Sequence, residues 1–126
     1  MSYKVYIPPG INYEPYPHEK FAARIMAKYF NADVIFIKKH DTAKSADLKI
    51  ENRIWEIKSP IGDGKYTMQN NLRDADGQSS NIVINLVRCK MSPEKAISRL
   101  NFQLKKAHKV KRLLVILKSG KVVVLK

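Results

Sequence analysis

The stretch ADLKIENRIWEIK, residues 46–58, decides how the rest of the chain is interpreted. Apolar and polar side chains alternate along residues 47–51 and again along residues 53–59, which predicts two β-strands. A short turn at Glu51-Asn52 joins them, so the two strands should pair as a hairpin. Everything else that we infer about fold and function starts from this hairpin.

Pairing of the two strands brings charged side chains together at one end of the hairpin. Asp47 opens the first strand and falls alongside Glu56 and Lys58, which share one face of the second strand, while Trp55 points to the opposite face and the core. Two carboxylates can hold a hard divalent cation that keeps some of its waters. A lysine beside it can orient or deprotonate a water molecule, and a phosphodiester is the matching substrate. The alternative is a solvated face on which Glu56 and Lys58 form an ion pair worth well under about 1 kcal/mol.

Further helices and strands are expected on both sides of the hairpin. The pattern predicts helices over residues 18–30, 67–76 and 93–107, and strands over residues 33–38, 81–88, 112–117 and 121–125. Asn31 ends the first helix, and Ser92 caps the third. The apolar stripe of the first helix consists of Phe21, Ala22, Ile25, Met26, Tyr29 and Phe30.

The order α-β-β-β-α-β-α-β-β predicts an α/β (α+β) domain with one central mixed β-sheet flanked by helices. Its 126 residues should form a single domain. We divide it into an extended arm rich in Tyr and Pro over residues 1–17, an αβββαβ core over residues 18–90, and a C-terminal helix and hairpin over residues 91–126.

The chain is strongly basic. It has 24 Lys and Arg residues against 11 Asp and Glu residues, a formal net charge of +13 at pH 7. Such a charge indicates a polyanionic partner, although general solubility is a simpler explanation. Cys89 is the single cysteine, so no internal disulfide exists, and no apolar run approaches the ~20 residues that span a bilayer. We expect a cytoplasmic site of action and no membrane partner.

The arrangement of the chemistry-bearing residues resembles a known superfamily. Helix, strand, Asp-bearing strand, E-x-K strand, helix and strand follow one another as in the restriction-endonuclease-like core of PD-(D/E)xK nucleases. Asp47, Glu56 and Lys58 match the motif, and Ala46 stands where proline is usual. The resemblance implies that Asp47 and Glu56 bind Mg²⁺ or Mn²⁺ and that Lys58 activates water. Glu19 matches a glutamate that assists in many members, although it is equally suited to stabilise a helix N-terminus.

A closer resemblance covers more of the chain. The runs PHEKFAARIMAKYF (17–30), DVIFI (33–37) and the stretch over residues 46–86, with its W-E-I-K-S-P sequence, are similar to the C-terminal tRNase domain of contact-dependent growth-inhibition (CdiA-type) toxins. This resemblance implies cleavage of RNA, with tRNA the favoured substrate. It also implies an acidic immunity protein as a partner, and delivery of the toxin into neighbouring cells.

Five residues after the hairpin are expected to line the path of the substrate phosphates. They are Ser59, Lys65, Thr67, Arg73 and Gln78. Gln78 is the strongest of these, because side-chain amides near such sites often position the nucleophile or a base. The alternative for each is an ordinary residue on a loop or helix surface.

Three other functions remain open. Lys58, Thr67 and a histidine could cleave RNA through its 2′-hydroxyl without metal, in the manner of barnase or RelE. A DNA endonuclease also fits, because the motif does not distinguish the sugars. Finally, the chain could be a non-catalytic basic module that binds nucleic acid, with the acids in structural roles.

Overall fold

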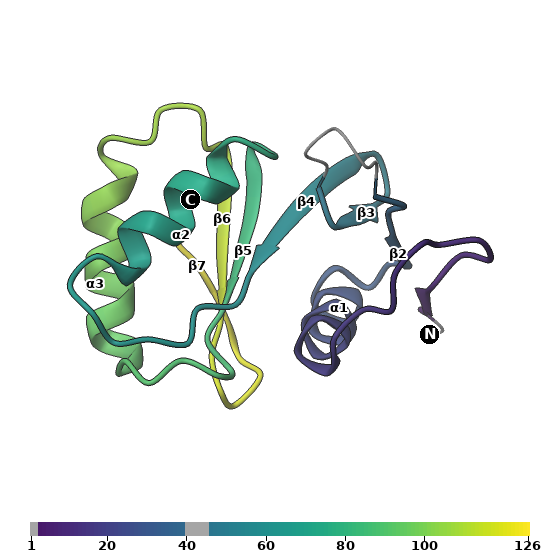
Figure 1. Ribbon diagram of the computed structural model, residues 1–126, viewed down its shortest axis with the longest axis horizontal. Helices are drawn as coiled ribbons and strands as arrows, with labels where there is room; N and C mark the ends of the chain where they lie inside the picture. Colours follow the sequence, from purple (N-terminus) through teal and green to yellow (C-terminus); the bar gives the residue numbers. More distant parts are fainter. Residues whose placement is uncertain (1–2, 40–45) are drawn as a thin grey trace.

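The structure is a computed structural model that describes residues 3–39 and 46–126. Within these ranges the chain forms three α-helices and one seven-stranded mixed β-sheet (Figure 1). The predicted order of elements is confirmed, with one strand added at its start. In chain order the elements are β1 (Val5–Tyr6), α1 (Pro17–Phe30), β2 (Val34–Phe36), β3 (Leu48–Ile50), β4 (Arg53–Lys58), α2 (Thr67–Asp76), β5 (Asn81–Asn85), α3 (Pro93–Leu104), β6 (Arg112–Ile116) and β7 (Val122–Val124).

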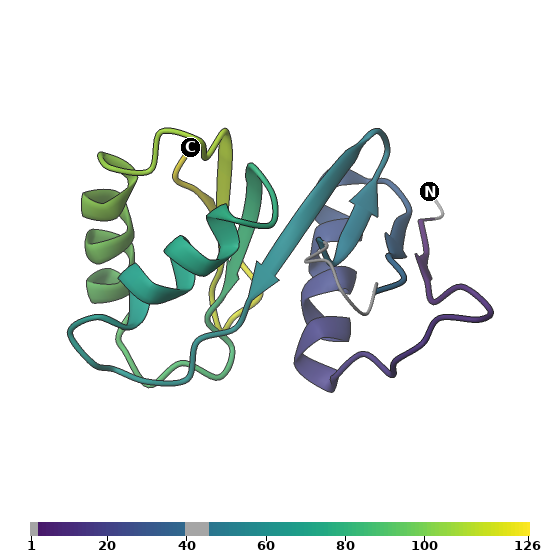
Figure 2. The ribbon, with the colours of Figure 1, turned by 45° about the horizontal axis from the view of Figure 1, so that its top comes forward.

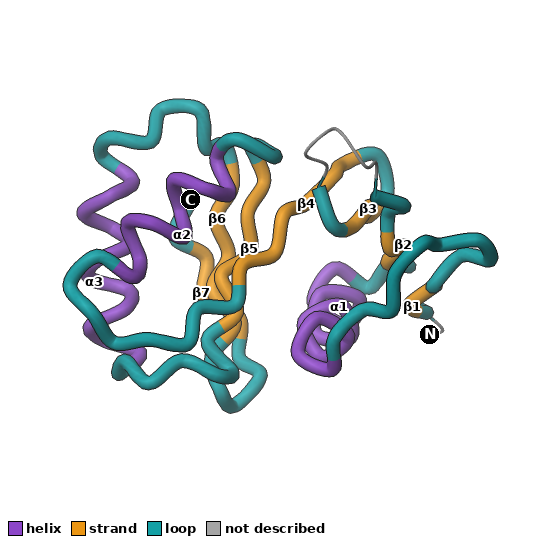
Figure 3. The backbone as a smooth tube through the Cα atoms, in the orientation of Figure 1, coloured by secondary structure: helices purple, strands orange, loops and turns teal. Residues whose placement is uncertain are grey.

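The strands lie side by side in the order in which they occur along the chain. β3 and β7 run antiparallel to their neighbours, whereas β1 pairs in parallel with β2, and β5 pairs in parallel with both β4 and β6. α1 packs on one face of the sheet, and α2 and α3 pack on the other, which gives three layers (Figure 2). The six-residue β4 runs between the strands beside α1 and the strands beside α2 and α3 (Figure 3).

Each face of the sheet has its own apolar core. On the α1 face, Trp55 is only 2% exposed and packs with Met26 and Phe36, as its strand position predicted. On the other face, Ile82 and Leu113 pack with the buried side chains of α2 and α3. All five residues of β5 are buried, which confirms the central position inferred from their apolar character.

β1 is the element that the sequence pattern did not reveal. Val5 pairs with Val34, the Val34 N–H donates to the carbonyl oxygen of Lys4 at 2.9 Å, and the Lys4 N–H donates to Asp33 Oδ1 at 2.8 Å. Two residues are too few to display strand periodicity, and the prolines that follow stop the strand from growing. The arm therefore extends the sheet instead of only packing over it.

Element boundaries differ most where the chain turns before its apolar pattern ends. β5 stops at Asn85 instead of residue 88, because a turn begins there in which the Cys89 N–H donates to the Leu86 carbonyl at 3.0 Å. α3 stops at Leu104 instead of residue 107, because the Lys106 N–H bonds to the Gln103 carbonyl in a tighter turn. α2 and the left-handed Asn31 at the end of α1 are as predicted.

The buried stripe of α1 also differs from the prediction. Ala22, Ala23, Met26 and Ala27 are its buried residues, whereas Tyr29 is 45% exposed. The small alanine side chains allow the helix to approach the sheet closely, so the large Tyr29 is left at the margin. The prediction that Tyr29 belongs to the core stripe was therefore wrong.

The α2 face of the sheet is covered over β5 and β6 but open over β2, β3 and β4. Ile35, Lys49 and Ile54 are cross-strand neighbours on this face, and all three are exposed. Glu56 lies two residues beyond Ile54 on the same face and is buried. The boundary between the covered and the open half therefore passes beside Glu56.

No helix within the described residues combines the length and the apolar composition that crossing a membrane requires.

Candidate active site

Asp47 and Glu56 form a buried pair of carboxyl groups where the β3–β4 hairpin begins and ends. The turn at Glu51, whose φ is 55°, fixes the register in which Leu48 pairs with Trp55. As a result the Asp47 N–H donates to the Trp55 carbonyl at 3.0 Å, and Asp47 Oδ2 accepts from the Ile57 N–H at 2.8 Å. Asp47 is 7% exposed and Glu56 is 3% exposed. The hairpin geometry thus brings the two acids together, as expected.

The pKa of Glu56 is raised from 4.5 to about 8. Burial is the largest cause, followed by the negative charge of Asp47 and the hydrogen bond between the two carboxyl groups, while the nearby Lys58 and Lys39 act in the opposite direction. Lys58 Nζ lies 3.4 Å from Glu56 Oε2. At neutral pH the Asp47–Glu56 pair therefore holds a proton, which a bound divalent cation would displace.

Lys39 is a member of the cluster that the sequence did not indicate. Its Nζ lies 2.6 Å from Asp47 Oδ1 and 3.4 Å from the Ala46 carbonyl oxygen. It follows β2, and the antiparallel pairing of β2 with β3 brings the end of one strand beside the start of the other. The strand order alone could have suggested such a neighbour, but not which residue it would be.

Gln78 contacts the Glu56 carboxyl group of the pair. With its amide nitrogen directed at Glu56, it donates to Oε2 at 2.5 Å and to Oε1 at 2.6 Å. The chain after α2 is held in place because Ser79 Oγ and Asn81 Nδ2 both donate to the Ile54 carbonyl, at 2.9 and 3.1 Å. Of the five expected substrate-path residues, Gln78 is the one that contacts a carboxylate of the pair.

Glu19 is not among the side chains that contact the pair. Its Oε1 accepts from the Tyr16 N–H at 2.8 Å, so it caps α1. Its charge acts on Tyr13: the pKa of Tyr13 is raised to about 12, first by burial and then by the charges of Asp47 and Glu19. The Tyr13 hydroxyl donates to the Ile37 carbonyl at 2.8 Å, and its ring lies 5.8 Å from Lys39 Nζ.

The other four expected substrate-path residues lie outside the carboxylate cluster. Thr67 lies against the glycine loop before α2, where its Oγ1 would be 3.3 Å from a Cβ added at Gly62. The Ser59 carbonyl accepts from Arg88 at 3.1 Å. Lys65 and Arg73 line hollows between α2 and α3.

The donor set of the pair suits a hard divalent cation. Across residues 3–39 and 46–126, no three acidic, His or Cys side chains gather closely enough to hold a metal ion. Mg²⁺, however, is commonly held by one or two carboxylates, with water and substrate phosphates completing its coordination. Burial and the charge of Asp47 together raise the pKa of Glu56, and a bound cation would act against both. A cation at Asp47 Oδ1 would compete with Lys39.

Comparisons with known proteins agree with this architecture. A sequence profile of the family described as "Contact-dependent growth inhibition CdiA C-terminal domain" matches residues 44–122, which include Asp47, Glu56, Lys58 and Gln78. A chain of the solved "CdiA-CT/CdiI toxin and immunity complex from Burkholderia pseudomallei" is similar in fold, with a TM-score of 0.67, 19% sequence identity and 98% of each chain covered. The comparison with curated proteins gives no match.

Proposed function

Since the chain belongs to the family of CdiA C-terminal domains of contact-dependent growth inhibition, we propose that it is a metal-dependent endoribonuclease toxin that cleaves tRNA. Domains of this family are generally toxins of the nuclease type. We also propose a PD-(D/E)xK, restriction-endonuclease-like core. The support for that core is the αβββαβ order and the position of Asp47, Glu56 and Lys58 at one point of the sheet.

The observation that carries the proposal is the buried Asp47–Glu56 pair at the edge of the open sheet face. Asp47 and Glu56 would hold Mg²⁺ or Mn²⁺, which when bound supplies positive charge for the phosphate and lowers the pKa of water. Burying two acids side by side in a chain of net charge +13 has no evident structural benefit, because each raises the energy of the other's charged form. A catalytic requirement would account for this cost.

The residues around the pair have separable roles in the proposed reaction. Lys58, whose Nζ lies 3.4 Å from Glu56 Oε2, would orient the attacking water and, as the neutral amine, help to remove its proton. Gln78 and Lys39 are positioning residues, since each binds one carboxylate and fixes its direction. Glu19 adds its negative charge from the margin of the site and keeps α1 capped. The basic surface would hold the RNA backbone.

Incubation with total tRNA and with plasmid DNA, each with Mg²⁺, Mn²⁺ or EDTA, tests the proposal. We expect tRNA to be cut with the metals and left intact in EDTA, and we expect the Asp47→Asn/Glu56→Gln variant to be inactive while keeping its circular dichroism spectrum. Full-rate cleavage in EDTA with a cyclic phosphate product would instead select the barnase-like reaction. Cleavage of plasmid alone would select a DNA endonuclease, and salt-dependent binding without cleavage would select a non-catalytic module.

We further propose an acidic immunity protein as the partner of this chain, and a cytoplasmic site of action after delivery into neighbouring cells. The support is the similar fold in a toxin and immunity complex and the +13 charge, which complements an acidic surface. Co-expression with an acidic immunity protein that binds this chain should restore growth that the toxin alone prevents. Growth that is equally poor with and without that protein would contradict this part.

A further inference from the structure

A groove lies between α2 and α3, outside the carboxylate pair. Two hollows of about 190 Å³ and about 450 Å³ lie along it, and they share Gln69, Gln103 and Lys106 in their walls. α2 and α3 run beside one another on the same face of the sheet (Figure 2). The larger hollow falls within the ~300–1,000 Å³ range of pockets that accept small organic groups. We call this feature the α2–α3 groove.

Two exposed aromatic rings line the α2–α3 groove, each with a lysine beside it. Tyr66 is 56% exposed and its ring lies 5.6 Å from Lys65 Nζ. Phe102 is 54% exposed and its ring lies 4.9 Å from Lys106 Nζ. Exposure of an aromatic ring to water costs free energy. The lysine beside each ring supplies a positive charge that a phosphate can bind.

Two arginines add to the positive charge of the groove. Arg99 is fixed to the loop before α2, since its Nη1 donates to the Lys65 carbonyl at 2.8 Å and to the Gly64 carbonyl at 3.3 Å. Arg73 donates to Asn70 Oδ1 at 2.9 Å and lines the smaller hollow. The groove therefore presents four cationic side chains around two aromatic rings.

One carboxylate oxygen in the groove wall has an unmet capacity for hydrogen bonds. Asp76, at the end of α2, lines the smaller hollow, and its Oδ1 is buried with no hydrogen-bond partner among the described residues. A buried acceptor without a donor is costly. The exocyclic amine of a nucleobase is a donor of the kind that would satisfy it once the Asp76 side chain turned toward the hollow.

We propose that the α2–α3 groove binds an unpaired stretch of RNA, with bases stacked on Tyr66 and Phe102 and phosphates on the surrounding cations. Aromatic platforms inside a basic groove are the usual means of holding single strands. A duplex keeps its bases stacked on each other, so it cannot use these rings. An acidic protein would also bind the cationic side chains, but it would have no need of a buried hydrogen-bond acceptor beside exposed aromatic rings.

The groove and the carboxylate pair lie on opposite flanks of α2. Gln78, two residues beyond the end of α2, contacts Glu56, whereas Gln69 and Arg73 in the same helix face α3. α2 with its side chains is about 10 Å wide, so one strand can cross it and reach both places. The assignment of the groove to the RNA substrate rests on the proposed function. Its binding of single-stranded RNA can be measured without cleavage.

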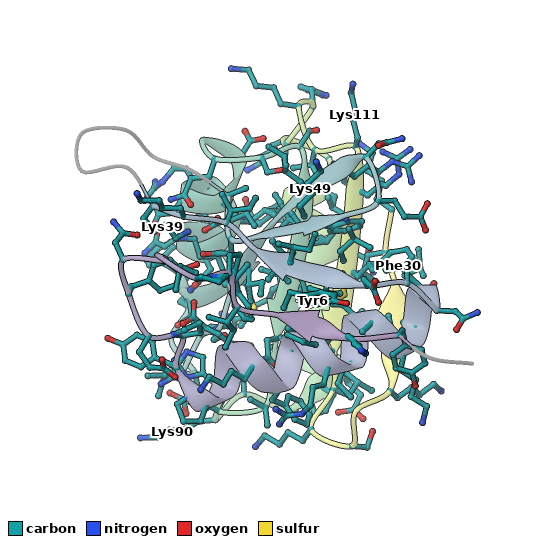
Figure 4. The ribbon with its side chains drawn as sticks, turned by 90° about the vertical axis from the view of Figure 1, so that its right-hand side faces the viewer. Tyr6, Phe30, Lys39, Lys49, Lys90 and Lys111 are labelled. Carbon is teal, nitrogen blue, oxygen red and sulfur yellow. The ribbon has the colours of Figure 1, made fainter. Side chains whose placement is uncertain are left out.

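Binding of a fluorescent 12-nucleotide single-stranded RNA to the full chain in EDTA tests the groove separately from the chemistry. We expect the Tyr66→Ala/Phe102→Ala variant to bind at least about tenfold more weakly, the effect of losing one stacked base. The matched control is Tyr6→Ala, which removes an exposed aromatic ring from β1 on the side of the molecule away from α2 and α3 (Figure 4). Equal affinity of wild type and double variant, or a preference of the wild type for duplex RNA, would overturn the proposal.

Cleavage kinetics separate the two proposals. In the Tyr66→Ala/Phe102→Ala variant we expect KM for tRNA to rise about tenfold while kcat stays within twofold. If the wild type binds single strands through the groove but does not cleave tRNA, the nuclease proposal is contradicted and the RNA-binding proposal is not. A normal KM in the double variant contradicts RNA binding in the groove but not the nuclease activity.

Asp76→Asn should reduce any preference for oligocytidylate over oligouridylate, because uracil has no exocyclic amine. An unchanged preference would exclude Asp76 from base contact.

Discussion

The two flanks of α2 hold charge in opposite ways. On the β4 flank, Asp47 and Glu56 are buried against one another, and the hairpin register fixes their positions. On the α3 flank, cationic and aromatic side chains are exposed on helix and loop surfaces. Strands fix a few polar groups rigidly enough for chemistry, whereas helix surfaces gather many long side chains for binding. Variants on each flank of α2 can separate a chemical role from a binding role.

Loss of the carboxylate pair should have the largest effect. Glu56→Gln should reduce tRNA cleavage to background, because the amide cannot provide the charge that a divalent cation needs. The variant should fold normally, since a pKa of about 8 means that the fold already favours the uncharged side chain. Single-turnover cleavage assays measure the effect, with Glu14→Gln as an exposed control. Appreciable cleavage by Glu56→Gln would remove Glu56 from the site.

The Lys58→Met substitution should have the second largest effect on cleavage. It should lower kcat at least about a hundredfold, because a lysine that orients the attacking water, or takes its proton as the neutral amine, contributes on this order. Lys49→Met is the matched control, an exposed lysine on the neighbouring strand and on the same open sheet face. If Lys58 only supplied charge for RNA binding, both variants would raise KM to a similar extent and leave kcat alone.

Gln78→Ala should have a smaller effect of about tenfold on kcat or on the Mg²⁺ concentration required. It removes two hydrogen bonds to Glu56 without removing the carboxylate itself. Titration of activity with Mg²⁺ distinguishes this positioning role from a direct one. Gln69→Ala, on the other flank of the same helix, should leave the Mg²⁺ dependence unchanged.

The last expected change is in the pH dependence of stability, which is measured without RNA cleavage. The pKa of Glu56 is higher in the fold, about 8, than its ordinary value of 4.5. Its contribution to stability is therefore fully present below pH 4.5 and is lost as the pH rises toward about 8, because the unfolded chain releases the proton first. Glu56→Gln should thus lose less stability than wild type between pH 5 and pH 8, as measured by urea unfolding.

Added Mg²⁺ supplies a second readout of the same pair. It should stabilise wild type more at pH 8 than at pH 5, since a bound cation needs the charged carboxylates and binds only the folded chain. Glu56→Gln should show little of this gain. Parallel pH profiles for the two proteins would mean that Glu56 is not the group that titrates.

Much of the fold could be predicted because its elements are long and periodic. α2 agrees with its predicted bounds, and Ser92 accepts from the Lys95 N–H at 3.3 Å as a helix cap should. β1 could not be predicted, because two residues show no period and pair only with a strand 29 positions away. The alanine-lined face of α1 was not predicted, because the large Tyr29 side chain was expected to be buried in preference to Ala23 and Ala27.

The candidate site divides in the same way. The sequence by itself determined the meeting of Asp47, Glu56 and Lys58, since a two-residue turn and strand alternation leave one register for the hairpin. Only the tertiary structure decided that Lys39 and Gln78 complete the cluster and that Glu19 caps α1 instead of touching it. Local backbone geometry sets contacts within a hairpin, whereas contacts between distant segments depend on how helices and loops pack, which no short pattern encodes.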